Sequence, residues 1–144
     1  MEPVPDLIRA LIYASSAPTA AEAGAIRERM TSVEFPTIDD HLAQRKEDRQ
    51  WTAATTAIEF RSDIDEAIRA AARLGLYLRR GGYMAATIAA TDRVVPTERI
   101  GRIKRPYTFV VYSADRDTLV TAYQFTSMDT IVVPGDALWV DLPA

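Results

Sequence analysis

Residues 108–125, TFVVYSADRDTLVTAYQF, contain two runs of β-branched and aromatic residues on either side of a short polar segment. Side chains of this kind favour strands, and the segment ADRD at 114–117 has the composition of a tight turn. We therefore predict an antiparallel hairpin whose two strands flank that turn. In the second strand, side-chain alternation places Leu119, Thr121 and Tyr123 on one face.

The rest of the C-terminal half has the same β-rich texture, with turn residues between its apolar runs. The segment PGD at 134–136 is the clearest further turn signal. Neighbouring strands joined by short turns predict an antiparallel meander. The strands that we predict are 83–89, 108–113, 118–125, 130–133 and 137–142.

The N-terminal half is predicted to be helical. Apolar residues at helical spacing follow Pro5, which predicts a short first helix that ends near Ser15. Thr19 and Glu22 form a capping-box pattern at the start of a second helix, which runs to about Met30. Helices followed by an antiparallel β-sheet of hairpins make an α+β fold, here in a single domain of 144 residues.

Two more helices are predicted before the strands begin. A third starts after Thr37 and contains His41. A fourth starts at Ser62, and apolar residues at helical spacing, Leu76 among them, extend it as far as Gly81. The sequence therefore predicts that residues 62–80 are helical throughout.

The composition excludes several kinds of chemistry, because the chain has no cysteine and one histidine. Disulfides, thiol nucleophiles, thiolate zinc sites and sites with several imidazoles are ruled out. The acids at 39–40 and 115–117 occur where helix starts and turns favour carboxylates, so we predict neither a metal site nor a cofactor. No apolar stretch approaches the roughly 20 residues of a membrane helix, and the N-terminus lacks the basic region of a signal peptide, which predicts a cytoplasmic protein without membrane contact.

One basic segment interrupts a chain whose net charge is -3. Residues 79–105 contain seven basic side chains and two acidic ones, which gives this segment a charge of +5. A band of this kind suits binding to the phosphate backbone of RNA, and it is also typical of solvated loops beside strands. The residues that we assign to RNA binding are Arg79, Arg80, Arg102, Lys104 and Arg105.

Two groups of side chains have the types that proton transfer on a phosphate ester needs. In a helix, His41, Arg45 and Arg49 recur every four residues and share a face, which places an imidazole beside fixed cations. In the predicted hairpin, Thr121 and Tyr123 offer two hydroxyls side by side. Each pattern by itself is also typical of an exposed helix face or of ordinary strand residues.

The order of these features resembles the bacterial RNase A-like toxin domains found at the C-termini of contact-dependent growth inhibition proteins and other polymorphic toxins. The resemblance covers residues 38–126 and includes the early histidine, the segments TTAIEF at 55–60 and GRI at 101–103, and the late strand with the run VTAY. It implies that residues 37–144 form a toxin-like ribonuclease core and that residues 1–36 form a helical N-terminal extension.

The resemblance also implies a metal-independent endoribonuclease toxin, in which attack by the 2′-hydroxyl of RNA leaves a 2′,3′-cyclic phosphate. His41 and Tyr123 would transfer protons, and Thr121 would bind a phosphate oxygen or a base edge. Arg49 or Arg45 would stabilise the charged phosphorane. RNA would then be the substrate and a cognate antitoxin or immunity protein the partner, while the oligomeric state stays open.

The alternative is a non-catalytic protein-binding module on a similar α+β scaffold, such as an immunity-like, antitoxin-like, phage or regulatory protein. Leu7, Ile8, Leu11 and Ile12 lie on one side of the first predicted helix and would form a surface for a partner protein or for a second copy of the chain. Growth of cells that express the chain distinguishes the two functions, because a nuclease toxin arrests growth and a binding module does not.

Overall fold

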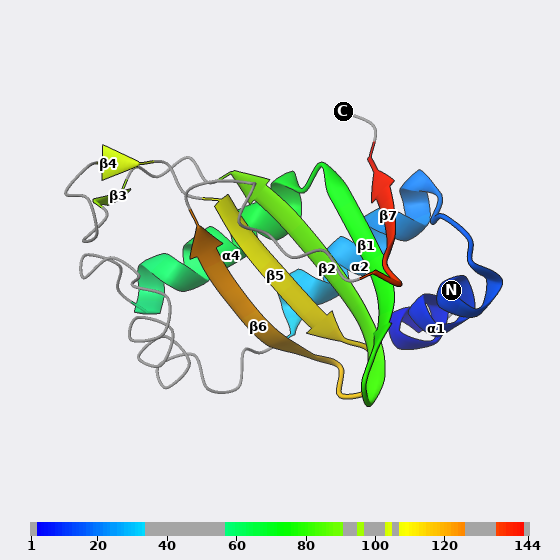
Figure 1. Cartoon of the computed structure of the whole chain (residues 1–144). Helices are drawn as coiled ribbons and strands as arrows, with labels where there is room; N and C mark the ends of the chain where they lie inside the picture. Colours follow the sequence, from blue (N-terminus) through cyan, green and yellow to red (C-terminus); the bar gives the residue numbers. More distant parts are fainter. Residues whose placement is uncertain are drawn as a thin grey trace.

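The computed structural model describes residues 3–33, 57–90, 95–96, 103–104, 107–125 and 135–142. Within these ranges, three helices precede seven strands (Figure 1). The helices are α1 (Val4–Ala14), α2 (Ala20–Ser32) and α4 (Ala57–Ala70). The strands are β1 (Arg73–Arg79), β2 (Gly82–Ala90), β3 (Val95–Pro96), β4 (Ile103–Lys104), β5 (Tyr107–Ser113), β6 (Thr118–Phe125) and β7 (Leu138–Asp141).

Five of the strands form one antiparallel sheet in the order β6-β5-β2-β1-β7, and β3 pairs with β4 separately. The three helices lie against one face of the five-stranded sheet; in Figure 1, α2 and α4 pass behind the strands and α1 lies to the right of β1. Strands β1, β2, β5 and β6 follow one another across the sheet, and β7 returns to pair with β1. The predicted α+β fold, with helices before an antiparallel sheet, is confirmed.

The main core lies between the helices and the sheet. Ile8 of α1, Ile26 of α2 and Ile64 of α4 are fully buried there, together with Leu74 and Tyr112 from the strands. Because all three helices contribute to one apolar cluster, removing any of them would expose the cluster to water. The helices α1 and α2 therefore share the core of the sheet.

The apolar side of α1 faces this core. Leu7, Ile8 and Leu11 are buried, and Ile12 packs against the same cluster. From the sequence, we predicted that these four residues form a surface for a partner protein or for a second copy of the chain. That expectation is wrong for the buried residues, because the sheet and the other helices already cover them.

Local sequence signals explain where α1 and α2 begin and end. Thr19 accepts a hydrogen bond from the backbone N–H of Glu22 at 3.2 Å, and the Glu22 carboxylate accepts one from the Thr19 N–H at 2.9 Å. This reciprocal pair satisfies two backbone donors at the start of α2, as the capping-box pattern predicts. α1 ends where Ser15 adopts a left-handed conformation with a φ of 51°.

The predicted fourth helix is correct only in its first part. α4 ends at Ala70, and residues 73–79, expected to be helical, form the strand β1. Leu74, Leu76 and Leu78 alternate with other residues as a strand requires, and β1 pairs with β2 on one side and β7 on the other. A two-residue turn joins β1 to β2, and its Gly81 has a φ of 91°, which a residue with a side chain rarely adopts.

The hairpin of β5 and β6 forms as predicted, with its turn at residues 114–117. The register shifts between Val111 and Tyr112, so the first residues of β6 point to the opposite face from the one that regular alternation predicts. Leu119 is buried in the core on the helix side, whereas Thr121 pairs with Val111 on the other side. The prediction that Leu119 and Thr121 share a face is therefore wrong, because the irregularity lies between them.

Two predicted elements, the third helix with His41 and the strand 130–133, lie outside the described residues. The first strand of the predicted meander is confirmed as β2, and the last as β7. Among the parts of the chain that the structure describes, no helix combines the length and the apolarity that crossing a membrane would require.

Candidate active site

Thr121 and Tyr123 belong to β6, the strand at one end of the five-stranded sheet. In the register, Thr121 is opposite Val111 and Tyr123 is opposite Phe109. Val111 and Phe109 belong to an apolar cluster on the face of the sheet that is turned away from α1, α2 and α4, which we call the second face. The strand therefore presents positions 121 and 123 on this second face, as the sequence predicts for these two.

The register aligns residues of all five strands in two neighbouring rows across the second face. One row consists of Thr121, Val111, Ala86, Gly75 and Trp139. The other consists of Tyr123, Phe109, Ile88, Arg73 and Asp141. Thr121 is thus aligned with Trp139 of β7, and Tyr123 is aligned with Arg73 of β1, toward the opposite end of the sheet.

Trp139 lies flat over the backbone of its row neighbour. A Cβ atom added to Gly75 would come within 2.8 Å of three carbon atoms of the Trp139 ring, so this close approach requires glycine. The ring also packs near Phe109 of β5, with 6.4 Å between the ring centroids. Trp139 is half-buried, and its Nε1–H is buried without a hydrogen-bond partner in the structure.

Arg73 brings a cation to the same end of the second face. Its guanidinium lies 5.4 Å from the centroid of the Trp139 ring, and its Nε is 2.8 Å from Oδ1 of Asp141. The Arg73 side chain keeps 43% of its surface exposed, and the Asp141 carboxylate balances its charge. Sequence reasoning missed Arg73 because it placed this residue in a helix, although the alternation of Leu74, Leu76 and Leu78 beside it is a strand signal.

Burial limits which parts of the second face a ligand can touch. Tyr77, Met84, Phe109 and Val111 are each at most 6% exposed. Thr121 is half-buried and lies three strand spacings across and two residues along the strands from Arg73, about 16 Å away. A single phosphate cannot contact both residues, whereas a longer strand of nucleic acid can.

The structure separates two of the predicted RNA-binding residues from Thr121. Arg79 and Arg80 are exposed at the turn between β1 and β2. Thr121 is aligned with Gly75, which is four residues from Arg79 along β1 and three strands from β6. The separation between Thr121 and Arg79 is therefore about 20 Å. These arginines can therefore contact an RNA bound at the second face only through a distant segment of it.

The other candidate residues are not positioned as a site by the described parts of the chain. His41, Arg45, Arg49, Arg102 and Arg105 lie outside the described residues. For Lys104, the structure gives the backbone pairing with Val95 in the small sheet. Within the described residues, no group of three or more potential metal-binding side chains occurs.

The strongest perturbations of ionisation lie at the β5–β6 turn. Tyr112 donates a hydrogen bond to Asp117, and Arg29 of α2 donates to both carboxylate oxygens of Asp117, through Nε at 3.0 Å and through Nη2. The bonds from Arg29, and then that from Tyr112, lower the pKa of Asp117 against the opposing effect of its burial. Burial, and then the Asp117 carboxylate, raise the pKa of Tyr112. These bonds fasten the turn to α2 on the helix side, so their role is structural.

Replacing Gly75 with alanine should displace Trp139 from the second face, because the new methyl group has no room beneath the ring. We expect a loss of about 1–3 kcal/mol in the free energy of unfolding and a red shift of tryptophan emission, measured in a Trp51→Phe background. Gly24→Ala is the matched control, since nothing lies within 4 Å of its added Cβ. This helix substitution should stabilise the protein by up to about 1 kcal/mol. Unchanged emission in Gly75→Ala would contradict the described packing.

The chain was compared with models of protein families, with curated proteins and with solved structures. None of the three comparisons found a match.

Proposed function

We propose that the protein is a metal-independent endoribonuclease toxin, which cleaves RNA by attack of the 2′-hydroxyl and leaves a 2′,3′-cyclic phosphate. The observation that carries this proposal is the pairing of Thr121 and Tyr123 with Val111 and Phe109, which places both positions on the second face at the end of the sheet. Arg73 lies in the row of Tyr123, where its guanidinium is ion-paired with Asp141, so the face carries a cation whose charge is balanced.

The chemistry assigns a role to each candidate residue. His41 supplies an imidazole, the side chain that can both accept and donate a proton near neutral pH. Tyr123 acts as its proton-transfer partner or positions the ribose. Thr121 donates a hydrogen bond to a phosphate oxygen or a base edge. Arg49 or Arg45 stabilises the negative charge of the phosphorane.

Cleavage of RNA in the presence of EDTA tests this function directly. We expect the wild-type protein to cleave single-stranded RNA and to leave 2′,3′-cyclic phosphate and 5′-hydroxyl ends. His41→Ala and Tyr123→Phe should each lower the rate by about 10²–10⁴-fold, the range typical of a lost acid or base. Thr121→Ala should also be slower, and Thr118→Ala, the same change at the start of the same strand, should retain full activity.

Two outcomes would count against the proposal. A wild-type protein that leaves RNA intact refutes the function, and cleavage that survives equally in His41→Ala and Tyr123→Phe refutes the site. Expression in bacteria adds a readout that separates the nuclease from the protein-binding alternative. Growth arrest that is relieved by either substitution supports the toxin, and growth that is indifferent to expression supports the binding module.

A further inference from the structure

An exposed aromatic patch lies on the helix side of the sheet, at the end where β1 turns into β2. Among the described residues, Tyr13 and Leu78 are the large apolar side chains that stay exposed, at 75% and 46%. Both flank one residue, because Leu78 pairs with Tyr83 across the hairpin and the Tyr13 ring lies 5.8 Å from the Tyr83 ring. We call Tyr13, Leu78 and Tyr83 the tyrosine patch.

Neighbouring polar groups orient the two tyrosines of the patch. The hydroxyls of Tyr13 and Tyr83 are hydrogen-bonded to each other at 2.7 Å. The guanidinium of Arg9 lies 5.7 Å from the centroid of the Tyr83 ring, and both Asp6 and Asp115 accept hydrogen bonds from it at 2.9 Å. A surface whose side chains are already ordered loses little conformational entropy on binding.

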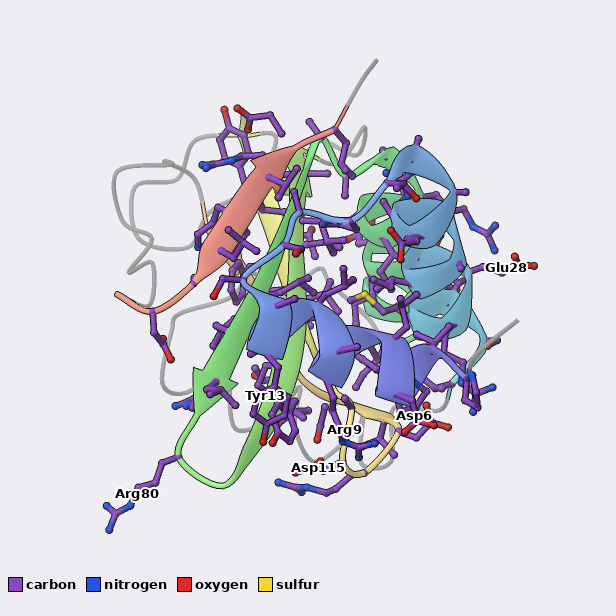
Figure 2. The ribbon with its side chains drawn as sticks, turned by 90° about the vertical axis from the view of Figure 1, so that its right-hand side faces the viewer. Asp6, Arg9, Tyr13, Glu28, Arg80 and Asp115 are labelled. Carbon is purple, nitrogen blue, oxygen red and sulfur yellow. The ribbon has the colours of Figure 1, made fainter. Side chains whose placement is uncertain are left out.

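The two ends of the patch carry opposite charges, and Figure 2 shows their order. Arg80 extends from the tip of the β1–β2 turn at one end, whereas Asp6 lies beyond Tyr13 at the other. Asp115 lies between them, since a Cβ atom added to Gly82 would come within 3.2 Å of its carboxylate. Arg80 is exposed, and the side chains of Asp6 and Asp115 are 53% and 39% exposed. The group of Asp6, Arg9 and Asp115 has two negative charges and one positive charge, so the sequence of features is cation, aromatic surface and net anion.

We propose that the tyrosine patch binds a second copy of this chain, related to the first by a two-fold axis through the patch. Such an axis places Arg80 of each copy against the carboxylate end of the other. The spacing permits this, since Asp6 lies about 10 Å from Tyr13 along α1 and Arg80 lies two strand residues, about 7 Å, beyond Leu78 before its long side chain begins. Tyrosine and arginine are also among the side chains enriched at the energetically dominant positions of protein interfaces.

A second copy fits the patch better than other occupants. A uniformly acidic protein, or RNA, would meet the carboxylates of Asp6 and Asp115 as well as Arg80. A copy of the same surface presents each charge to its opposite. Since the patch is on the helix side, the dimer leaves the second face open in both copies, so the inference does not depend on the proposed nuclease activity.

Sedimentation velocity of the full chain tests the proposal, over a concentration series from about 1 μM to about 1 mM. We expect a concentration-dependent dimer that weakens as salt is added, because the charged ends are exposed. Tyr13→Ser and Arg80→Glu should each raise the dissociation constant by roughly tenfold or more. Arg69→Glu makes the same charge change at an exposed position of α4 and should leave the dimer unchanged.

Mixing two charge variants makes the test specific for the two-fold arrangement. Arg80→Glu alone and Asp6→Lys alone each place like charges at both ends of the interface, so each should dimerise at least about tenfold more weakly than the wild type. An equimolar mixture restores both opposite-charge pairs and should associate as well as the wild type does. Circular dichroism and thermal unfolding verify that each variant is folded.

Three results would overturn the proposal. The first is a wild-type protein that stays monomeric over the whole series, and the second is a mixture of the two charge variants that does not associate. The third is assembly that requires an added RNA oligonucleotide and is independent of protein concentration, which would assign the patch to RNA instead.

Discussion

A chain that lacks residues 1–33 should show no cooperative unfolding transition. Besides Ala23, this segment contributes six large apolar side chains to the main core, namely Leu7, Ile8, Leu11, Ile26, Met30 and Val33. At about 2 kcal/mol for each side chain, their burial contributes roughly 12 kcal/mol. That is comparable with the whole stability of a typical domain, about 5–15 kcal/mol. The shortened chain would also expose the apolar helix side of the sheet to water.

Thermal and urea unfolding, followed by circular dichroism, measure this effect. Smaller changes in the same helix test the same cause: Ile26→Ala should cost about 2–5 kcal/mol, because Ile26 is fully buried. Glu28→Ala, two residues along α2 on its exposed side, should change the stability by less than about 0.5 kcal/mol (Figure 2). A shortened chain that unfolds cooperatively near the wild-type midpoint would show that the first two helices are dispensable for the sheet.

Asp117→Ala should destabilise the protein by about 2–4 kcal/mol, although the residue lies in a surface turn. The Asp117 carboxylate accepts hydrogen bonds from Tyr112, whose side chain is otherwise fully buried, and from Arg29 of α2. Removing the carboxylate leaves the buried Tyr112 hydroxyl without this acceptor. Asp117 also has a φ of 52°, a left-handed conformation that aspartate and asparagine adopt more readily than alanine.

Two companion variants separate these causes. Asp117→Asn keeps the tolerance for the left-handed conformation and an oxygen that accepts from Tyr112, so it should lose less stability than Asp117→Ala. Tyr112→Phe removes the hydroxyl together with its need for an acceptor and should therefore cost about 1 kcal/mol. Equal stability of Asp117→Ala and the wild type in urea would show that the turn is not fastened to α2 through this carboxylate.

The stability supplied by Asp117 should also depend on pH. Hydrogen bonds from Arg29 lower the pKa of Asp117 in the folded protein. Its contribution is therefore fully present above the unfolded pKa, about 3.9, and is lost as the pH falls through the lower folded pKa. The difference in stability between the wild type and Asp117→Ala should shrink below about pH 4. On the alkaline side, the raised pKa of Tyr112 predicts a loss of stability as the pH rises above about 10.

The candidate site was partly visible in the sequence. Thr121 and Tyr123 stand two apart in a strand whose type follows from its β-branched and aromatic residues, so their common face needs only local alternation. Arg73 and Trp139 could not be assigned to the same face from local pattern, because their rows depend on which strands become neighbours. In addition, Leu76 continues the helical spacing of α4, so the sequence pattern predicted a helix at Arg73 instead of a strand.

The sequence by itself determined the elements whose signals are local. The capping box of Thr19 and Glu22 sets the start of α2, and the polar segment 114–117 sets the turn between β5 and β6. In both cases the deciding contacts are between residues only a few positions apart, so the pattern of side chains is sufficient.

Only the tertiary structure decided how these elements meet. Leu119 changed face because of an irregularity in the pairing of β6 with β5, and β1 became a strand because β2 and β7 pair with both of its edges. The return of β7 to β1 is what brings Trp139 over Gly75, across more than sixty positions of sequence. Pairings over such distances depend on packing and on the order of strands in the sheet, which no local pattern of residues encodes.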